Sequence, residues 1–320
     1  MGTFLVIEPG MLTTVQDLGR TGLGAMGIPV GGAADTLSLR AGNRLLGNAD
    51  NAAGLEMTLT GAAIEFEADA FVTLTGGASG ATLARPGAAA KAISPLQPVP
   101  VAAGSRLIVG PILGSARGYL CVRGGINVAQ VLNSASTHLG AEFGGFGGRA
   151  LRAGDRLEFH DTPGHPLDRR IAPGAGELLN VSSAQRTIAA IDGANQSLFD
   201  RAAVELFWSS TFKVLSQSNR VGVRLQGPPV ASPSDGQLIS EGMPPGAIQV
   251  PQSGEPIVLG VDHPTTGGYP VIACVITADL CILGRARPGD TVSFRRVSLD
   301  EARAMHRRQE QRFTELFGTP

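Results

Sequence analysis

The sequence is poor in charge and in lysine. Only 17% of its 320 residues are charged, and the formal net charge is −1. Lys91 and Lys213 are the only lysines among 26 lysine and arginine residues, which leaves little room for a mechanism centred on lysine. A chain without a broad charged surface offers little to nucleic acid or to an anionic membrane. We therefore expect small or neutral binding partners, with no nucleic acid and no membrane among them.

Cysteine and histidine are also scarce, and neither forms a recognised site. The three cysteines are an odd number and contain no CxxC pair, so the sequence indicates neither a disulfide framework nor a zinc site. The five histidines show no HExxH or similar ligand spacing, so no metal site is predicted. No GxSxG elbow marks a serine hydrolase. The cysteines and histidines are Cys121, Cys274, Cys281, His138, His160, His165, His263 and His306.

Long apolar runs are absent as well. No stretch approaches the roughly 20 residues that a membrane span needs. Residues 1–9 lack the basic region and the longer apolar stretch of a secretory signal. Together with the scattered cysteines, these features predict a soluble protein of the reducing cytoplasm.

Glycine and proline are abundant, with 44 and 21 residues, and short β-rich segments lie between them. This pattern predicts a mostly β protein with a few helices, because barrels and sandwiches need many tight turns. The length and the 43% hydrophobic content favour two domains with sizeable cores. We expect a barrel-like domain over 1–170, a second barrel over 171–297 and a C-terminal helix over 298–320. The boundary is predicted in the Pro- and Gly-rich stretch 163–176.

Three segments carry helix end signals. Asp35 precedes a helical pattern over residues 36–46, and Ser197 precedes another over 198–208. Ser298 and Glu301 have capping-box spacing, which predicts a tail helix to about residue 317.

An internal repeat indicates that the two predicted domains are diverged copies of one unit. The motif R-x-G-x₄-G-x-P begins at Arg20 and again at Arg220, and three further matched segments follow in the same order. A residue present in both copies is as well explained by a role in the shared architecture as by a role in the chemistry. The matched pairs of interest are Arg20 with Arg220, Glu56 with Glu241, and Tyr119 with Tyr269.

The strongest functional segment is residues 262–270, DHPTTGGYP. The hydroxyls of Thr265 and Thr266, beside the open backbone of Gly267 and Gly268, are suited to bind a carbonyl oxygen, carboxylate or phosphate. Tyr269 is a further hydrogen-bond donor. The alternative is a Gly-rich hairpin in which the threonines satisfy their own backbone.

Polar residues upstream are candidates for the same site. Glu241 has the chemistry of a general base, and Gln249 can pair with an amide through both of its polar atoms. Ser218, Arg220 and Asp262 are further candidate substrate-binding residues, together with Gly267 and Gly268. For each of them, loop capping or strand-face polarity is the competing interpretation.

Four stretches closely resemble the allophanate hydrolase subunit 2 family, also called the biotin-dependent carboxyltransferase or urea amidolyase-related family, which includes the C subunit of bacterial 5-oxoprolinase. They are residues 12–20 (LTTVQDLGR), 143–151 (FGGFGGRAL), 246–251 (GAIQVP) and 265–270 (TTGGYP). The resemblance implies tandem cyclophilin-like β-barrels. It also implies a smaller partner, the B subunit, which is similar to allophanate hydrolase subunit 1, and in the oxoprolinase a third partner, the A subunit.

In that family the oxoprolinase cleaves the lactam of 5-oxoproline with ATP, whereas urea carboxylase relatives move a carboxyl group from carboxybiotin to urea. The resemblance therefore implies part of an amide- or lactam-acting hydrolase that is active as a complex, with ATP bound somewhere in that complex. Three positions depart from the family pattern: Val271 replaces a common lysine, Asn219 an aspartate and Gly31 a serine. No biotin-attachment motif is present, so biotin, if used, arrives on another protein.

We hypothesise a subunit of an ATP-dependent 5-oxoprolinase in which Thr265, Thr266 and Tyr269 orient the substrate carbonyl and Glu241 assists proton transfer. A biotin-dependent carboxyltransferase or allophanate hydrolase-type subunit of urea metabolism is the second hypothesis. The third is a non-catalytic regulator that binds a kinase or its inhibitor.

Overall fold

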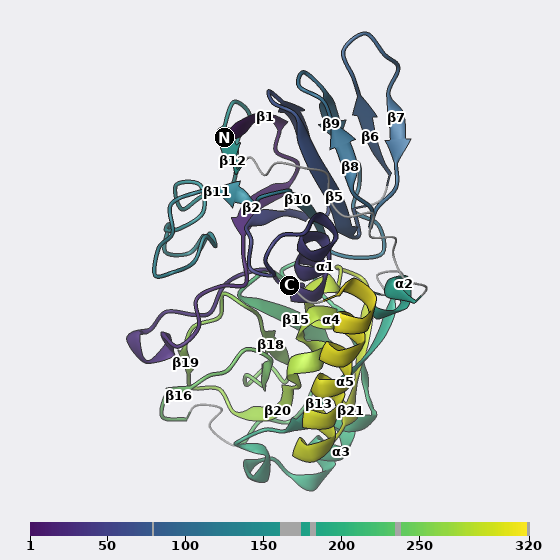
Figure 1. Cartoon of the computed structure of the whole chain (residues 1–320). Helices are drawn as coiled ribbons and strands as arrows, with labels where there is room; N and C mark the ends of the chain where they lie inside the picture. Colours follow the sequence, from purple (N-terminus) through teal and green to yellow (C-terminus); the bar gives the residue numbers. More distant parts are fainter. Residues whose placement is uncertain (79, 161–173, 180–183, 234–237, 319–320) are drawn as a thin grey trace. The chain divides into compact units, whose positions relative to one another are not determined.

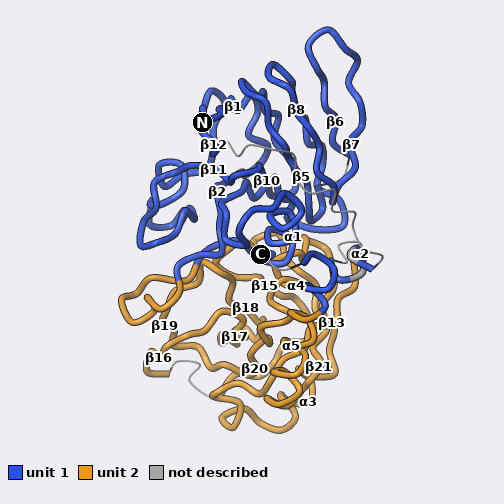
Figure 2. Tube along the Cα trace, viewed as in Figure 1, with its two compact units in different colours: residues 1–20, 31–182, 312–320 blue, residues 21–30, 183–311 orange. Residues whose placement is uncertain are grey.

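The computed structural model describes the chain except for residues 79, 161–173, 180–183, 234–237 and 319–320. The chain forms two compact units, each assembled from separate stretches (Figure 2). The first contains Met1–Arg20, Gly31–Ser182 and Arg312–Pro320, and the second contains Thr21–Val30 and Ser183–Gln311. Most of the predicted boundary stretch 163–176 lies outside the described residues.

The first unit contains two antiparallel sheets (Figure 1). The seven-stranded sheet has the order β11 (Ile126–Asn127), β12 (Arg156–Phe159), β1 (Gly2–Glu8), β4 (Ala63–Phe66), β9 (Arg106–Ile108), β6 (Ala81–Ala84) and β7 (Lys91–Ile93). The five-stranded sheet has the order β2 (Leu12–Gln16), β3 (Gly54–Thr58), β10 (Arg117–Val122), β5 (Ala70–Gly76) and β8 (Val99–Val101).

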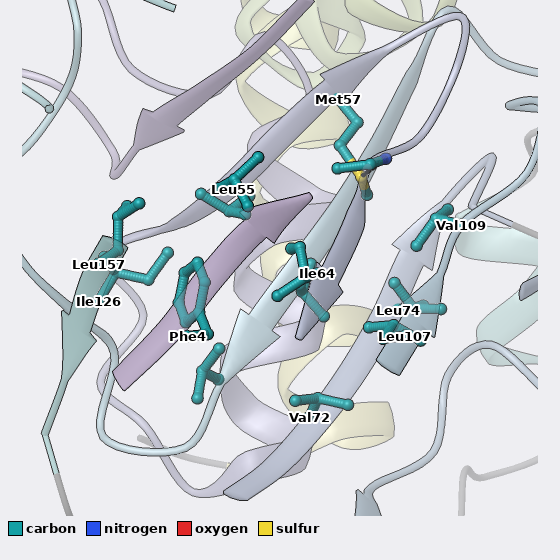
Figure 3. Close-up of a cluster of buried hydrophobic side chains, with 14 of the residues drawn as sticks. Phe4, Leu55, Met57, Ile64, Val72, Leu74, Leu107, Val109, Ile126 and Leu157 are labelled. Carbon is teal, nitrogen blue, oxygen red and sulfur yellow. Dashed lines mark hydrogen bonds between the residues drawn. The ribbon is translucent and has the colours of Figure 1, made fainter. Parts of the chain in front are cut away.

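Strand β10 is buried on both faces, and its sequence explains why. Leu120 and Val122 belong to the main core of the unit, whereas Tyr119 and Cys121 pack with residues of the helix α1 (Thr36–Leu46). Because successive strand residues point to opposite faces, a strand between a sheet core and a helix reads as a continuous buried run. Figure 3 shows the main core, where Phe4, Ile64 and other strand residues meet.

Helix α1 has the predicted bounds and the predicted cap. The Asp35 carboxylate accepts a hydrogen bond from the Ser38 backbone N–H at 3.2 Å and from the Ser38 hydroxyl at 2.5 Å. Gly47 ends the helix in the left-handed conformation, with φ of 73°. The tail helix α5 (Leu299–Phe317) is also confirmed: the Ser298 N–H donates to the Glu301 carboxylate, and the Glu301 N–H donates to the Ser298 hydroxyl.

The helix predicted to begin at residue 198, after Ser197, in fact begins later. A 3₁₀ turn, η2 (Gln196–Leu198), occupies that position, and the helix α3 runs over Arg201–Ser209. Between them Phe199 and Asp200 are extended, and the Phe199 side chain is buried in the core of the second unit. Burial of that ring therefore prevailed over the local capping signal. Two further short helices were not predicted: α2 (Ala175–Leu178) and α4 (Leu280–Arg285).

The second unit contains a closed seven-stranded barrel, which agrees with the prediction of a mostly β fold. Its order is β13 (Gln185–Asp192), β20 (Val271–Val275), β17 (Ala247–Gln249), β18 (Ile257–Leu259), β15 (Gly222–Gln226), β14 (Thr211–Val214) and β21 (Thr291–Arg296). β21 closes the barrel by pairing in parallel with β13. A separate two-stranded ribbon, β16 (Glu241–Gly242) with β19 (Thr266–Gly267), belongs to the same unit.

The strands matched by the sequence repeat are paired differently in the two units. β17 and β20 are neighbours in the barrel, whereas their counterparts β4 and β10 belong to different sheets of the first unit. Within the described residues, no helix combines the length and apolarity required to cross a bilayer.

We expect Asp35→Ala to lower the free energy of unfolding by about 1 kcal/mol, since it removes the N-cap acceptor of α1. Asp35→Asn is the matched control, because asparagine caps equally well. Urea denaturation of both variants checks this. Equal losses in the two variants would show that the side-chain cap is not the stabilising interaction.

Candidate functional site

The candidate site is a cavity of about 740 Å³ in the second unit. One part of its lining comes from the loop 24–30, near the N-terminus of the chain, and the other from residues 242–245 and 263–266. The lining residues are Gly24, Ala25, Gly27, Ile28, Pro29, Val30, Gly242, Met243, Pro244, Pro245, His263, Thr265 and Thr266. The volume lies in the range of small-molecule sites.

The β16–β19 ribbon separates Thr266 from Glu241. Gly242 stands opposite Thr266, and Glu241 stands opposite Gly267. Directly opposed residues in an antiparallel pair share a face, and adjacent ones point to opposite faces. Thr266 and Glu241 therefore lie on opposite faces of the ribbon, and Thr266 is the one that lines the cavity.

The hydroxyls of Thr265 and Thr266 are available to a ligand. Both residues line the cavity, and neither hydroxyl has a hydrogen-bond partner in the described part of the chain. The backbone of Thr265 is fixed independently, because its carbonyl accepts the Met243 N–H at 2.8 Å. The site thus offers two hydroxyl donors on a backbone that strand pairing holds in place.

The other face of the ribbon brings together Glu241, Gly267 and Gln249. A side-chain carbon at Gly267 would lie 2.5 Å from the Gln249 amide nitrogen, so a larger residue there would have to displace the end of the Gln249 side chain. Glu241 is exposed and accepts a long hydrogen bond of 3.5 Å from the Asn195 amide. Neither Glu241 nor Gln249 lines the cavity.

Arg220 and Asp262 form a buried, two-pronged ion pair. The guanidinium Nε and Nη2 donate to the two carboxylate oxygens at 2.7 and 3.0 Å, and the Asp262 N–H donates to the Arg220 carbonyl at 3.1 Å. The pair fixes the start of the segment that carries His263 and Thr265. Its observed contacts are architectural, and the predicted substrate-binding roles of Arg220 and Asp262 stay predictions.

The remaining predicted residues lie outside the cavity lining. The Ser218 hydroxyl accepts the Arg224 N–H at 3.0 Å and lies 3.4 Å from the Arg224 carbonyl, so it closes a turn. Tyr269 is 40% exposed. The Gly268 carbonyl accepts the Leu238 N–H at 2.7 Å. For these residues too, substrate contact stays a prediction.

No role was predicted for His263, although it stands inside the motif that was singled out. The side chain is buried and lines the cavity. Its Nδ1 lies 2.7 Å from the Pro264 carbonyl oxygen. Burial lowers the pKa of His263, more than the Pro264 carbonyl and the Asp262 carboxylate raise it. The only feature of the sequence that pointed to a role for His263 was its position between Asp262 and Thr265.

Cysteine and metal chemistry have no support in this unit. Burial raises the pKa of the Cys274 thiol to about 11, so it stays protonated at neutral pH and is a poor nucleophile. Among the described residues, His, Cys, Asp and Glu side chains nowhere gather in a group of three or more that would suit a metal ion.

In the first unit, the motif 13–20 is hydrogen-bonded to residues 134–136, and the motif 144–149 packs against Thr137. The Asp17 carboxylate accepts hydrogen bonds from Ser134, Ser136 and the Ala135 N–H. A side-chain carbon at Gly145 would lie 1.9 Å from the Thr137 hydroxyl oxygen. Close packing thus accounts for the glycine at this position.

We expect Arg220→Met to destabilise the protein by about 3–5 kcal/mol, because it leaves the Asp262 carboxylate buried without its partner. The double variant Arg220→Met/Asp262→Leu removes both charges and is expected to be clearly more stable than the single variant. Chemical denaturation measures both. A single variant as stable as the wild type would contradict a buried, interacting pair.

Comparisons with known proteins support one family. The model of the carboxyltransferase domain, subdomain A and B, matches residues 26–296. The chain is 40% identical over 311 residues to the C subunit of 5-oxoprolinase from Escherichia coli, covering 97% of this chain and 96% of that protein. It is 35% identical to urea amidolyase of Lachancea kluyveri, of which it covers 18%.

A solved structure agrees with these sequence matches. The crystal structure of the Kluyveromyces lactis urea carboxylase superposes with a TM-score of 0.89 at 31% identity, covering 98% of this chain and 29% of that one. The chain thus corresponds to a part of the large yeast enzymes and to nearly the whole of the bacterial protein. The match to the family model and the identity to a near full-length relative show that the chain belongs to the family of the carboxyltransferase domain, subdomains A and B.

Proposed function

We propose that the chain is the C-type subunit of an ATP-dependent 5-oxoprolinase, which opens the lactam of 5-oxoproline to give glutamate. The observation that carries the proposal is the 40% identity to the C subunit of 5-oxoprolinase across nearly the full length of both chains. The corresponding protein of Haemophilus influenzae is 39% identical over 313 residues. In this proposal the chain acts only in a complex with the B and A subunits, in the cytoplasm.

The cavity of the second unit supports amide chemistry. An amide-type carbonyl gains partial negative charge as it is attacked, and preorganised donors stabilise that charge. The hydroxyls of Thr265 and Thr266, which bond to nothing else in the described chain, are such donors. The proposed roles of Tyr269 as a third donor and of Glu241 in proton transfer have less support, because neither lines the cavity.

The same lining does not fit a nucleoside triphosphate. Phosphoryl groups are held by lysine, arginine and metal-bound oxygens, and the 13 lining residues contain no lysine, arginine or acidic residue. We therefore propose that ATP binds outside this cavity. The finer fold assignment, a tandem of cyclophilin-like barrels, is likewise part of the proposal and rests on family resemblance.

Carboxyl transfer from biotin is the second candidate, favoured by the family model and by the TM-score of 0.89 to the urea carboxylase. Biotin would then arrive on another protein. Avidin inhibition of turnover would support this candidate. Binding without turnover in every reconstituted mixture would instead support a non-catalytic regulator.

We expect Thr265→Val/Thr266→Val to lower kcat for glutamate release by about 100-fold or more, because each change removes one donor while keeping the side-chain shape. The assay is ATP-dependent glutamate release from 5-oxoproline by the chain co-expressed with its partner subunits. Thr211→Val, at an exposed threonine of β14, is the matched control and should retain wild-type activity. Full activity of the double variant would exclude this site.

A further inference from the structure

His263 is the one titratable side chain among the described residues that line the cavity. The loop 24–30 contributes glycine, alanine and larger apolar residues, and residues 242–245 contribute glycine, methionine and two prolines. Thr265 and Thr266 add hydroxyls alone. The Met243 sulfur is only a weak acceptor and already accepts the Gln249 amide, so the stronger side-chain acceptors in this lining are the threonine hydroxyls and the imidazole of His263.

The backbone determines the tautomer of the His263 ring. A carbonyl oxygen only accepts hydrogen bonds, so the contact of 2.7 Å between Nδ1 and the Pro264 carbonyl requires the hydrogen to be on Nδ1. In the neutral ring Nε2 then carries a lone pair and acts as an acceptor. Burial favours this neutral form by lowering the pKa of His263.

The Nε2 atom is open to the cavity. It has no hydrogen-bond partner among the described residues. It is also not one of the polar atoms that are fully buried without a partner. It therefore keeps some accessible surface. Because the whole residue is only 2% exposed and lines the cavity, that surface lies within the cavity.

We propose that the neutral Nε2 of His263 accepts a hydrogen bond from the N–H of the substrate's amide group, while the hydroxyl of Thr265 or Thr266 donates to its carbonyl. In a lactam the N–H and the C=O lie on the same edge of the ring, so one side of a cavity can bind both. His263 and the two threonines supply an acceptor and a donor from one segment, which are the two groups that this edge requires. The inference rests on the proposed function and deepens it by naming the residue that selects an N–H-bearing amide.

This role makes lactam binding dependent on pH. Protonation turns Nε2 from an acceptor into a donor, which repels the substrate N–H. Since the pKa of His263 is lowered, binding persists at neutral pH and is lost on acidification below the ordinary histidine value of about 6.5. The charge that acts on the ring is that of Asp262, which is paired with Arg220, while Glu241 lies on the face of the ribbon opposite to Thr266.

The test uses the full chain alone, with 2-pyrrolidone and N-methyl-2-pyrrolidone as probes, and imidazole ¹⁵N NMR as the readout. We expect the Nδ1–H tautomer for His263, a shift of its Nε2 resonance on adding 2-pyrrolidone, and about 10-fold weaker binding of the N-methyl form. His263→Phe should weaken 2-pyrrolidone binding to the level of the N-methyl form. His160→Asn, at an exposed histidine of the first unit, is the control and should change neither affinity.

His263→Gln provides a second variant that does not depend on tolerance of a phenyl ring. Its side-chain carbonyl is an acceptor that does not titrate, so lactam binding should survive at the acidic pH at which the wild type loses it. The inference is overturned by an Nε2–H tautomer, by an unshifted His263 resonance, or by discrimination that persists in His263→Phe. These measurements need no partner or turnover, so a failed oxoprolinase assay with intact lactam discrimination would reject the proposed function alone.

Discussion

The buried ion pair between Arg220 and Asp262 anchors the segment of the candidate site that carries His263 and the two threonines. Its two short hydrogen bonds fix the residue immediately before His263, and the backbone bond between the same two residues ties the segment to the start of β15. A buried guanidinium and carboxylate tolerate little displacement, because separating them would leave two unpaired charges away from water. The imidazole and the two threonine hydroxyls that follow are consequently held at defined positions beside the cavity.

Strand alternation then divides the predicted residues into two groups. Thr266 lies on one face of the β16–β19 ribbon, with Gly242 opposite, and Glu241 lies on the other with Gly267 and Gln249. The cavity lining is accordingly uncharged: it offers hydroxyl donors and one neutral imidazole. Such a lining suits the amide group of a ligand, which is polar and uncharged.

Features that depend on neighbouring residues were predictable. The Asp35 cap of α1 and the capping box of α5 were found because each is a bond between residues three positions apart. The segment 262–270 was found because two threonine hydroxyls stand beside two glycines with open backbone N–H groups. The start of α3 was not, because a core contact of Phe199 outweighed the local signal at Ser197.

The amino-acid pattern alone was enough to predict the mostly β class, two capped helices, the family and one of the segments that line the cavity. The folded chain was needed to show that residues 24–30 and 263–266, more than 200 positions apart, line one cavity, and that Thr266 faces it while Glu241 does not. The barrel closure between β13 and β21 was likewise unpredictable. These outcomes depend on strand register and on burial between residues far apart in the sequence. One local pattern is compatible with many registers and contacts, and only the complete fold determines which of them form.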